Sequence, residues 1–331
     1  MERLAVSSVP DINRAQCSIS ASFLGPIGKV DTLVCRAFDY DPYSKGTQLL
    51  VTEDPYAVIE AILLGCVLSS CRTSVLCVSS DLAKEQLLYA WSEIGKTFPR
   101  IRSCFNIKVI KVPTLYFYKD VRVLVDFLFH ISPLCTGDPS ITLTPEQLPA
   151  VATDIESLMS ALSLIQKGEV VNYPYVTVWN NSDFLCLFEY RAGIRITDLW
   201  KIITSSGDVG EDYLVQNGGL FSPLRKMREV CSESVNGNAV MFIRSDFIYR
   251  HILNVVEVFH KQCCGKCVAG REGGFQILQI MQKVISEKKA ENNLWDLARQ
   301  ISLALIFLGS CEFGHSFGNW FVQVERFIHH G

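Results

Sequence analysis

Apolar and polar residues follow two different periods along the first half of the chain. Three short apolar runs have the length of buried strands, at 30–38, 74–79 and 107–112. Two segments between these runs repeat their apolar residues at the helical period instead, at 54–67 and 81–91. A chain that alternates strand, helix, strand, helix and strand predicts a parallel α/β sheet with right-handed crossovers.

Both helices of this half have recognisable N-termini. Asp54 is expected to cap the first helix, because its carboxylate can accept from the N–H groups of the first turn. Pro55, which follows it, suits the first helical position. Asp81 is expected to cap the second helix in the same way. These residues therefore mark where each helix begins.

The second half of the chain changes from strands to helices. Two segments typical of strands surround the turn 180–182, and a helical segment follows, at 175–179, 184–190 and 197–203. A further apolar run at 238–243 is expected to be the last strand. Three helical segments come after it, at 247–259, 275–284 and 294–308. The pattern predicts a small domain that begins with a hairpin, and then a helical C-terminal region.

The overall composition is that of a globular chain with more than one domain. The chain has 331 residues, of which 49% are hydrophobic and 20% are charged. Its net charge of −3 provides no electrostatic attraction for nucleic acid or for an anionic membrane surface, so neither is an expected partner. The most apolar run, 57–68, is too short to cross a bilayer and contains Glu60, so no direct membrane insertion is expected.

The cysteine usage points to a reducing compartment. The chain has 13 cysteines, and only those at 263–267 are closely spaced. The N-terminal region contains Glu2 and Asp11 and lacks the apolar core of a secretory signal. We therefore expect most of the thiols to be reduced and buried.

The candidate chemistry lies in the cysteine loop at 263–267. Cys264 and Cys267 are separated by two residues, a spacing that lets one turn of backbone direct two thiolates at a single metal centre. Cys311 follows a predicted helix and is expected to be the distant third ligand. Thiolates of this kind suit zinc or iron–sulfur rather than calcium or magnesium.

Two motifs here resemble one family, the NADH-oxidising flavoprotein subunit of respiratory complex I and its relatives in NAD-linked hydrogenases and formate dehydrogenases. That family carries C-G-x-C-x-x-C-R-E-G and a later C-x-x-G turn, whose four cysteines bind a [4Fe–4S] cluster. The matching positions are Cys264, Gly265, Lys266, Cys267, Arg271, Glu272, Gly273, Cys311 and Gly314. The third family cysteine is replaced by Gly270, and Cys263 is an additional thiol.

The first half resembles the same family more loosely, from Thr32 through Leu158. Residues 54–63 are similar to the family segment D-P-H-x-V-I-E-G-I-L, and residues 149–158 to P-T-V-V-N-N-V-E-T-L. The resemblance implies an α/β protein, α+β overall, with a Rossmann-like parallel-sheet domain, a β-grasp (ubiquitin-like) domain and a C-terminal helical bundle. The expected domains are an irregular segment followed by these three, at 1–29, 30–165, 166–235 and 236–331.

The flavin- and nicotinamide-binding elements of that family are altered in this sequence. The family's Gly-rich phosphate loop has no counterpart beyond Gly25 and Gly28, and its paired asparagines correspond to Thr153-Asp154. Its acidic segment corresponds to 36–44, where Ala37 and Pro42 match and where Arg36 and Phe38 change the charge and the volume of the pocket. Its third, glycine-rich segment has larger side chains at Val112, Thr114, Lys119 and Arg122. FMN and NAD are therefore predicted to be absent, with no catalytic or cofactor-binding residue.

The metal site has three interpretations at this stage. Cys264, Cys267 and Cys311 could hold an iron–sulfur cluster that is incomplete, because Gly270 cannot be a ligand. Cys263 is not expected to replace it, since side chains of successive residues usually point apart. His315 could instead complete a Cys₃His zinc site. The third interpretation is that the three cysteines are packed thiols that bind no metal.

Three functions follow from the resemblance. The favoured one is a pseudoenzyme, a divergent flavoprotein-like subunit that is a structural or assembly component of a larger complex. The alternatives are an electron-transfer subunit of an NADH dehydrogenase-type complex that retains an iron–sulfur cluster, and a zinc-stabilised interaction module. The expected partners are other subunits of that complex. The expected location is the matrix side of the mitochondrial membrane, or the cytoplasm if the source is bacterial.

Overall fold

The computed structural model describes residues 32–119, 124–125, 127–128, 150–168, 175–181, 183–189, 193–205, 212–263, 265, 267–287, 292–309 and 311–330. These residues form two compact units. The first unit contains most of the described chain up to Tyr175. The second contains the chain from Val176 onward together with two short segments, Asp41–Ser44 and Leu115–Phe117.

The first unit is built on a four-stranded parallel sheet, as the alternation of strands and helices predicts. Its strands are β1 (Thr32–Arg36), β2 (Thr73–Val78), β3 (Asn106–Lys111) and β4 (Ala150–Asp154), in the order β3-β2-β1-β4. All three pairings are parallel. The apolar runs predict β1, β2 and β3, whereas β4 is not predicted because its sequence, AVATD, has too weak an apolar pattern.

Helices complete the core of the first unit. They are α3 (Gly46–Glu53), α4 (Pro55–Ser69), α5 (Asp81–Thr97), α6 (Pro99–Cys104) and α8 (Ile155–Lys167), with a short 3-10 turn, η1, at Tyr116–Lys119. The predicted cap of α4 is confirmed, since the Asp54 carboxylate accepts from the Ala57 N–H at 3.0 Å. The predicted cap of α5 is wrong by one residue. The Ser80 hydroxyl accepts from Ala83 N–H at 3.2 Å, and Asp81 lies in the first turn.

The second unit begins with a five-stranded mixed sheet. Its strands are β5 (Tyr175–Asn180), β6 (Asp183–Glu189), β7 (Tyr213–Asn217), β8 (Leu224–Lys226) and β9 (Ala239–Arg244), in the order β6-β5-β9-β7-β8. The first and last strands, β5 and β9, are parallel neighbours at the centre. The helix α9 (Ile196–Thr204) packs on the sheet through Trp200, whose ring lies 4.9 Å from that of Phe242. This is the predicted β-grasp arrangement. Its central strand, β9, lies beyond residue 235, where the β-grasp domain was predicted to end.

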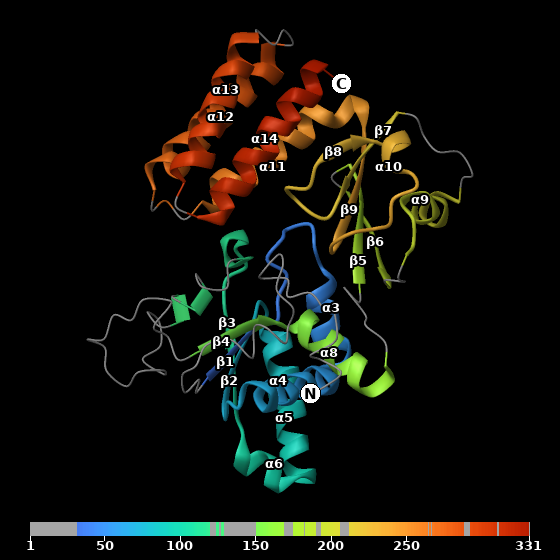
Figure 1. Ribbon diagram of the computed structural model, residues 1–331, viewed down its shortest axis with the longest axis vertical. Coiled ribbons are helices and arrows are strands. Elements are labelled where there is room, and N and C mark those ends of the chain that lie inside the picture. The colour runs from blue at the N-terminus through green and yellow to red at the C-terminus, as the bar shows by residue number, and fades with distance from the viewer. Residues whose placement is uncertain are drawn as a thin grey trace. The chain divides into compact units, whose positions relative to one another are not determined.

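The C-terminal part of the second unit is a helical bundle. A short helix, α10 (Met227–Val230), and a 3-10 turn, η2 (Ser245–Phe247), precede it. Its helices are α11 (Ile248–Gln262), α12 (Val268–Glu287), α13 (Asn292–Leu308) and α14 (Glu312–His330), coloured orange to red in Figure 1. Aromatic rings fill the bundle, and those of Phe259 and Phe317 stack in parallel with centroids 3.9 Å apart. No helix among the described residues has the length and apolar character to span a membrane.

The described cysteines are less buried than expected. Only four of the ten are buried, all in the first unit: Cys35, Cys66, Cys71 and Cys77. Burial raises the pKa of the Cys66 thiol to about 12 and keeps it protonated. The prediction that most thiols are buried is therefore wrong for the described residues. The cysteines of the second unit are partly accessible.

A buried histidine makes the stability of the second unit dependent on pH. His251 of α11 is 3% exposed, and its Nε2 lies 2.8 Å from the Gln216 Oε1 atom. Among the described residues its Nδ1 has no hydrogen-bond partner. Burial lowers the pKa of His251 to about 4, well below the usual 6.5, so the folded protein holds the neutral ring.

The stability contributed by neutral His251 is complete above pH 6.5 and is lost as the pH falls toward 4, because only the unfolded chain takes up the proton. We expect the free energy of unfolding of the wild type to fall by about 2 kcal/mol more than that of a His251→Phe variant between pH 7 and pH 5. Urea unfolding of both proteins at the two pH values measures this difference. A difference that stays constant with pH would contradict the assignment.

Candidate functional site

The carboxyl end of the parallel sheet is occupied by a buried arginine. Arg36, the last residue of β1, is 2% exposed. Its Nη1 donates to the carbonyl oxygens of Tyr118 and Lys119 at 2.9 and 3.1 Å, and its guanidinium carbon lies 4.4 Å from the centroid of the Tyr40 ring. Ligands of open parallel sheets usually bind at this edge. Here a charged side chain and its partners take that place.

Aromatic side chains fill the space beside Arg36. Tyr118 is 1% exposed, and its ring meets that of Phe38 edge to face with centroids 6.2 Å apart. The Phe127 ring lies 5.3 Å from Tyr118 on another side. Burial raises the pKa of Tyr118 to about 12, so the phenol stays neutral. Arg36 and Phe38, which differ from the family pattern in this segment, are therefore both part of a packed interior.

An internal carboxylate occupies the N-terminus of α3. The two Asp39 oxygens accept from the backbone N–H groups of Thr47 and Gln48 at 3.1 and 2.9 Å. The first N–H groups of a helix are a natural site for phosphate, and here the protein's own side chain uses them. This role of Asp39 was not predicted from the sequence. The acidic residues at 39–41 do not indicate it, because α3 itself was not predicted.

Two further acidic residues lie buried near β4. Asp154 caps α8, since its carboxylate accepts from Ser157 N–H at 2.8 Å. Glu156 accepts a hydrogen bond from the Thr47 hydroxyl. Burial, together with the charge of Asp154, raises the pKa of Glu156 to about 8. At neutral pH Glu156 is thus mostly protonated, and the group is a hydrogen-bonded network of the core.

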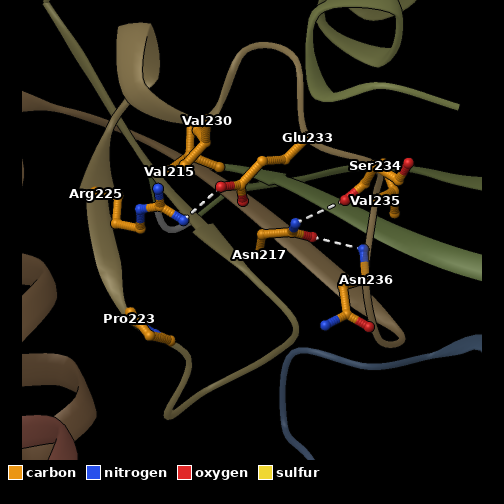
Figure 2. Close-up of a pocket in the computed structure, with 9 residues that line it drawn as sticks. All are labelled: Val215, Asn217, Pro223, Arg225, Val230, Glu233, Ser234, Val235 and Asn236. Atoms are coloured by element: carbon orange, nitrogen blue, oxygen red, sulfur yellow. Dashed lines mark hydrogen bonds and ion pairs between the residues drawn. The ribbon is translucent and has the colours of Figure 1, made fainter.

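A solvent-accessible cavity of about 430 Å³ lies in the β-grasp domain, beside β7 and β8. Figure 2 shows the Arg225 and Glu233 side chains directed at each other, and the Asn217 amide directed at the chain at Ser234 and Asn236. Arg225 pairs with Glu233 at 2.7 Å, and the Asn217 amide bonds the backbone of Ser234 and Asn236 at 3.0 and 2.8 Å. These groups neutralise each other, and they include no cysteine or histidine. The cavity therefore does not supply a metal-binding or nucleophilic set.

The cysteine loop joins two helices of the bundle. Cys263 is the residue after α11, and Cys267 immediately precedes α12. The Gly270 N–H in the first turn of α12 points at the Cys267 sulfur, with N and Sγ 3.3 Å apart. Hydrogen bonds of this kind to ligand sulfurs are typical of iron–sulfur sites. Cys264 and Lys266 lie outside the described residues, so the predicted convergence of Cys264 with Cys267 and Cys311 stays a prediction.

The structure brings Cys263 and Cys267 to the same place. A Cβ atom built on Gly270 would lie 3.0 Å from the Cys267 sulfur and 3.1 Å from the Cys263 sulfur. Gly270 is the position at which the family has its third cysteine. Contrary to the expectation from sequence, the additional thiol of Cys263 therefore does reach the neighbourhood of the missing ligand.

Cys311 lies at the same end of the bundle. It precedes α14, and its sulfur lies 3.8 Å from the Cβ position of Gly314. The side chain of Leu305 connects this turn to α12, because it lies 3.9 Å from the Cβ positions of both Gly273 and Gly314. Among the described residues, no three His, Cys, Asp or Glu side chains are close enough to hold a metal ion. Cys263, Cys267 and Cys311 therefore do not form a metal-binding group in this structure, and Cys264 lies outside the described residues.

Positive charge and one histidine surround the loop. Arg271 donates from Nη1 to the Gly265 carbonyl at 3.3 Å and from Nε to Glu272 at 2.8 Å. The pKa of this exposed guanidinium is raised first by Glu272 and also by the thiols of Cys263 and Cys267. The His315 Nε2 lies 2.7 Å from the Gly309 carbonyl oxygen. Metal-bound histidines usually make such a bond with their second nitrogen, so His315 could bind only through Nδ1.

A known protein family matches the part of the chain that contains the cysteine loop. Residues 250–327 match the family model of the NADH-ubiquinone oxidoreductase-F iron-sulfur binding region. This range contains the entire loop, Cys311 and most of α14. No curated protein matches the chain.

Two crystal structures of an NAD+-reducing [NiFe]-hydrogenase have a similar fold. The structure of the H2-reduced state has a TM-score of 0.80 at 17% sequence identity, and the match covers 99% of this chain and 60% of that chain. The air-oxidised state has a TM-score of 0.72 at 15% identity, with 98% and 62% covered. This chain thus spans less than two thirds of the hydrogenase chains, and at this identity the likeness establishes the fold.

The fold and the matched region together show what this protein is similar to. Residues 250–327 resemble the iron–sulfur binding region of the NADH-ubiquinone oxidoreductase F subunit, and the chain has the fold of a subunit of an NAD+-reducing [NiFe]-hydrogenase. The predicted resemblance to the complex I flavoprotein subunit is confirmed at this level.

Proposed function

We propose that this chain is a divergent flavoprotein-like subunit that has lost flavin and NADH chemistry and serves as a structural or assembly component of a larger complex. The observation that carries this proposal is Arg36. Its buried guanidinium donates to two backbone carbonyls at the carboxyl end of β1, where a parallel sheet would bind a nucleotide. A core arginine that is bonded in this way cannot move aside without breaking both hydrogen bonds.

The surroundings of Arg36 support the same proposal. FMN and NAD carry phosphate, which needs free N–H groups or positive charge. The α3 N-terminus already binds the Asp39 carboxylate, and Asp154 is a further buried acidic residue of the same unit. The aromatic rings of Phe38 and Tyr118 fill the remaining space. Phosphate would therefore meet like charge and occupied donors.

The proposed partners are the other subunits of a complex of the NADH dehydrogenase type. The hydrogenase chains of similar fold support this, since this chain corresponds to 60% and 62% of their length. The proposed location follows that of such complexes, the matrix side of the mitochondrial membrane or the bacterial cytoplasm. Native gel electrophoresis of a tagged chain expressed in its source organism tests this, and migration only as a monomer would contradict it.

We expect the purified protein to carry no flavin and to bind none. Titrating FMN with the protein should leave the flavin fluorescence unquenched at protein concentrations of tens of micromolar, and NADH should not be oxidised. The physical reason is that the strand-end region of the first unit is filled by Arg36, Phe38 and Tyr118. Near-stoichiometric flavin that co-purifies and is bleached by NADH would overturn the proposal.

A second candidate function is electron transfer through a retained iron–sulfur centre. It is favoured by the two sulfurs of Cys263 and Cys267 beside Gly270, and by the Gly270 N–H directed at one of them. With Cys264 and Cys311, these residues would hold the cluster, which supplies one-electron transfer when it is bound. Arg271 beside the thiols would favour the reduced form by its charge. Iron and zinc analysis of anaerobically purified protein separates this function from a zinc-stabilised module using His315.

A further inference from the structure

We propose that the cavity of the β-grasp domain is a binding site for a small zwitterion, an α-amino acid with an apolar side chain. The cavity has a volume of about 430 Å³ and lies beside β7 and β8. Ligand sites in proteins have volumes of about 300 to about 1,000 Å³, so this cavity can hold one small molecule. The inference concerns the second unit alone. It is independent of the loss of flavin and of any metal in the cysteine loop.

The inner surface of the cavity is apolar. Val215 of β7, Val230 of α10 and Val235 line it, and they are 1%, 1% and 3% exposed. The exposed Pro223 adds a further apolar surface. An aliphatic group that contacts these side chains is removed from water, which stabilises the complex. The lining therefore favours a ligand with a small apolar part.

Two opposite charges lie at the same cavity. Arg225 belongs to β8, whereas Glu233 belongs to the segment that follows α10, and Figure 2 shows the two side chains directed at each other. The Arg225 Nη1 and Glu233 Oε1 atoms are 2.7 Å apart, and the side chains are 41% and 42% exposed. This bond uses one nitrogen of the guanidinium and one oxygen of the carboxylate. Further donors of Arg225 and the second oxygen of Glu233 can therefore bind a ligand.

The class of ligand follows from this pair. A ligand carboxylate can accept from Arg225, and a ligand ammonium can donate to Glu233. A half-exposed ion pair contributes little to stability, so the two side chains can adjust around a ligand at small cost. A ligand with a single charge would be repelled by one of the two residues. An α-amino acid carries both charges close together, and its aliphatic side chain suits the valines.

The wall that carries Glu233 is held in place by hydrogen bonds to the backbone. The Ile196 N–H donates to the Glu233 carbonyl oxygen at 2.9 Å. The Asn217 amide donates to the Ser234 carbonyl oxygen at 3.0 Å and accepts from the Asn236 N–H at 2.8 Å. A wall fixed in this way loses little conformational freedom when a ligand binds. The cavity is thus formed before the ligand enters.

The test titrates the full chain with L-leucine and follows binding by ligand-observed NMR. Two analogues separate the charges, because isocaproate lacks the amino group of leucine and isoamylamine lacks its carboxylate. We expect saturable binding of leucine with a dissociation constant of about 1 mM or below. Each analogue should bind about ten-fold more weakly or worse, since it loses one charge-assisted hydrogen bond.

Variants of the ion pair make the test specific for the two charges. Arg225→Met and Glu233→Gln should each weaken leucine binding about ten-fold or more. Arg225→Met should weaken the binding of isocaproate but not of isoamylamine, and Glu233→Gln should do the reverse. A pair that only supports folding would lower all three affinities together, which would contradict the inference. The matched control is Arg244→Met. It breaks a similarly exposed pair with Asp246, 2.6 Å apart and outside the cavity lining, and should bind leucine as the wild type does.

A further variant tests the place of binding. Ser234 is exposed and lines the cavity, so Ser234→Trp should fill the cavity and abolish leucine binding while thermal unfolding stays unchanged. A wild type that shows no saturable binding of leucine up to about 10 mM would overturn the inference. Analogues that bind as tightly as leucine would overturn the zwitterion as the class of ligand. Leucine binding that survives Ser234→Trp and both charge variants would overturn the assignment to this cavity.

Discussion

Replacing Arg36 by methionine should lower the free energy of unfolding of the first unit by about 3–5 kcal/mol. The arginine is 2% exposed, and its Nη1 satisfies two carbonyl oxygens at 2.9 and 3.1 Å. Burial and the charge of Asp154 raise the pKa of Glu156, and the positive charge of Arg36 lowers it by a smaller amount. Methionine fills a similar volume, but it removes both hydrogen bonds and the positive charge beside the buried acidic residues.

Hydrogen exchange measured by mass spectrometry is the suitable readout, because a protein of two units need not unfold in one step. Peptides from β1 and β2 should lose protection by about a hundred-fold or more, since every 1.4 kcal/mol is a factor of ten. The control is Arg102→Met, an exposed arginine 4.7 Å from the Trp91 ring, which should cost about 1 kcal/mol or less. Equal protection in wild type and Arg36→Met would show that Arg36 is not integral to this core.

The parallel sheet was predictable because its signals are local. Apolar runs of strand length alternate with amphipathic segments, and the Asp54-Pro55 pair marks a helix start that the structure confirms. The elements that were missed have weak local patterns. β4 reads AVATD, and α3 has no side-chain cap at its N-terminus. Their stability comes from tertiary pairing with β1 and from the Asp39 carboxylate, which no periodicity reveals.

The cysteine loop shows a similar division between what sequence can and cannot predict. The spacing of Cys264, Cys267 and Cys311 identified the loop as the place of interest, and the family match covers it. The position of Cys263 could not be predicted, because it depends on the backbone reversal at Gly265. Adjacent side chains diverge in regular structure, but this loop is not regular. The contact that matters is therefore visible only between Gly270 and the two sulfurs.

The changes at the two sites are of different kinds. At the strand ends of the first unit, larger and charged side chains replace small ones and take up hydrogen bonds of their own, so the space is filled. In the cysteine loop, one ligand is exchanged for glycine while another thiol lies beside the gap. Filling a pocket removes binding, whereas exchanging a ligand keeps the donor chemistry. This difference is the reason that we propose loss of flavin binding, while the loop keeps thiol donors.

Replacing Phe317 by alanine should lower the free energy of unfolding of the second unit by about 3–5 kcal/mol. Phe317 of α14 is 0% exposed. Its ring stacks on Phe259 of α11 at 3.9 Å with an interplanar angle of 1°, and meets Phe221 edge to face at 5.9 Å. Alanine removes both contacts and leaves a cavity that rigid neighbouring helices fill only in part.

The effect of Phe317→Ala should extend to the cysteine loop, because Phe259 also packs on Phe313, at 4.9 Å, two residues after Cys311. Loss of the central ring loosens the helix ends that carry Cys263 and Cys311. Hydrogen exchange should therefore rise in α11 and α14 and remain unchanged in β1 and β2. This is the reverse of the pattern expected for Arg36→Met, in which exchange rises in β1 and β2. Any metal reconstituted into the cysteine loop should also be lost faster. Phe307→Ala is the matched control, since that ring is 77% exposed and its removal should change stability by less than about 0.5 kcal/mol. If exchange rose equally in both units, the aromatic cluster would be supporting the whole chain rather than the bundle and its cysteines.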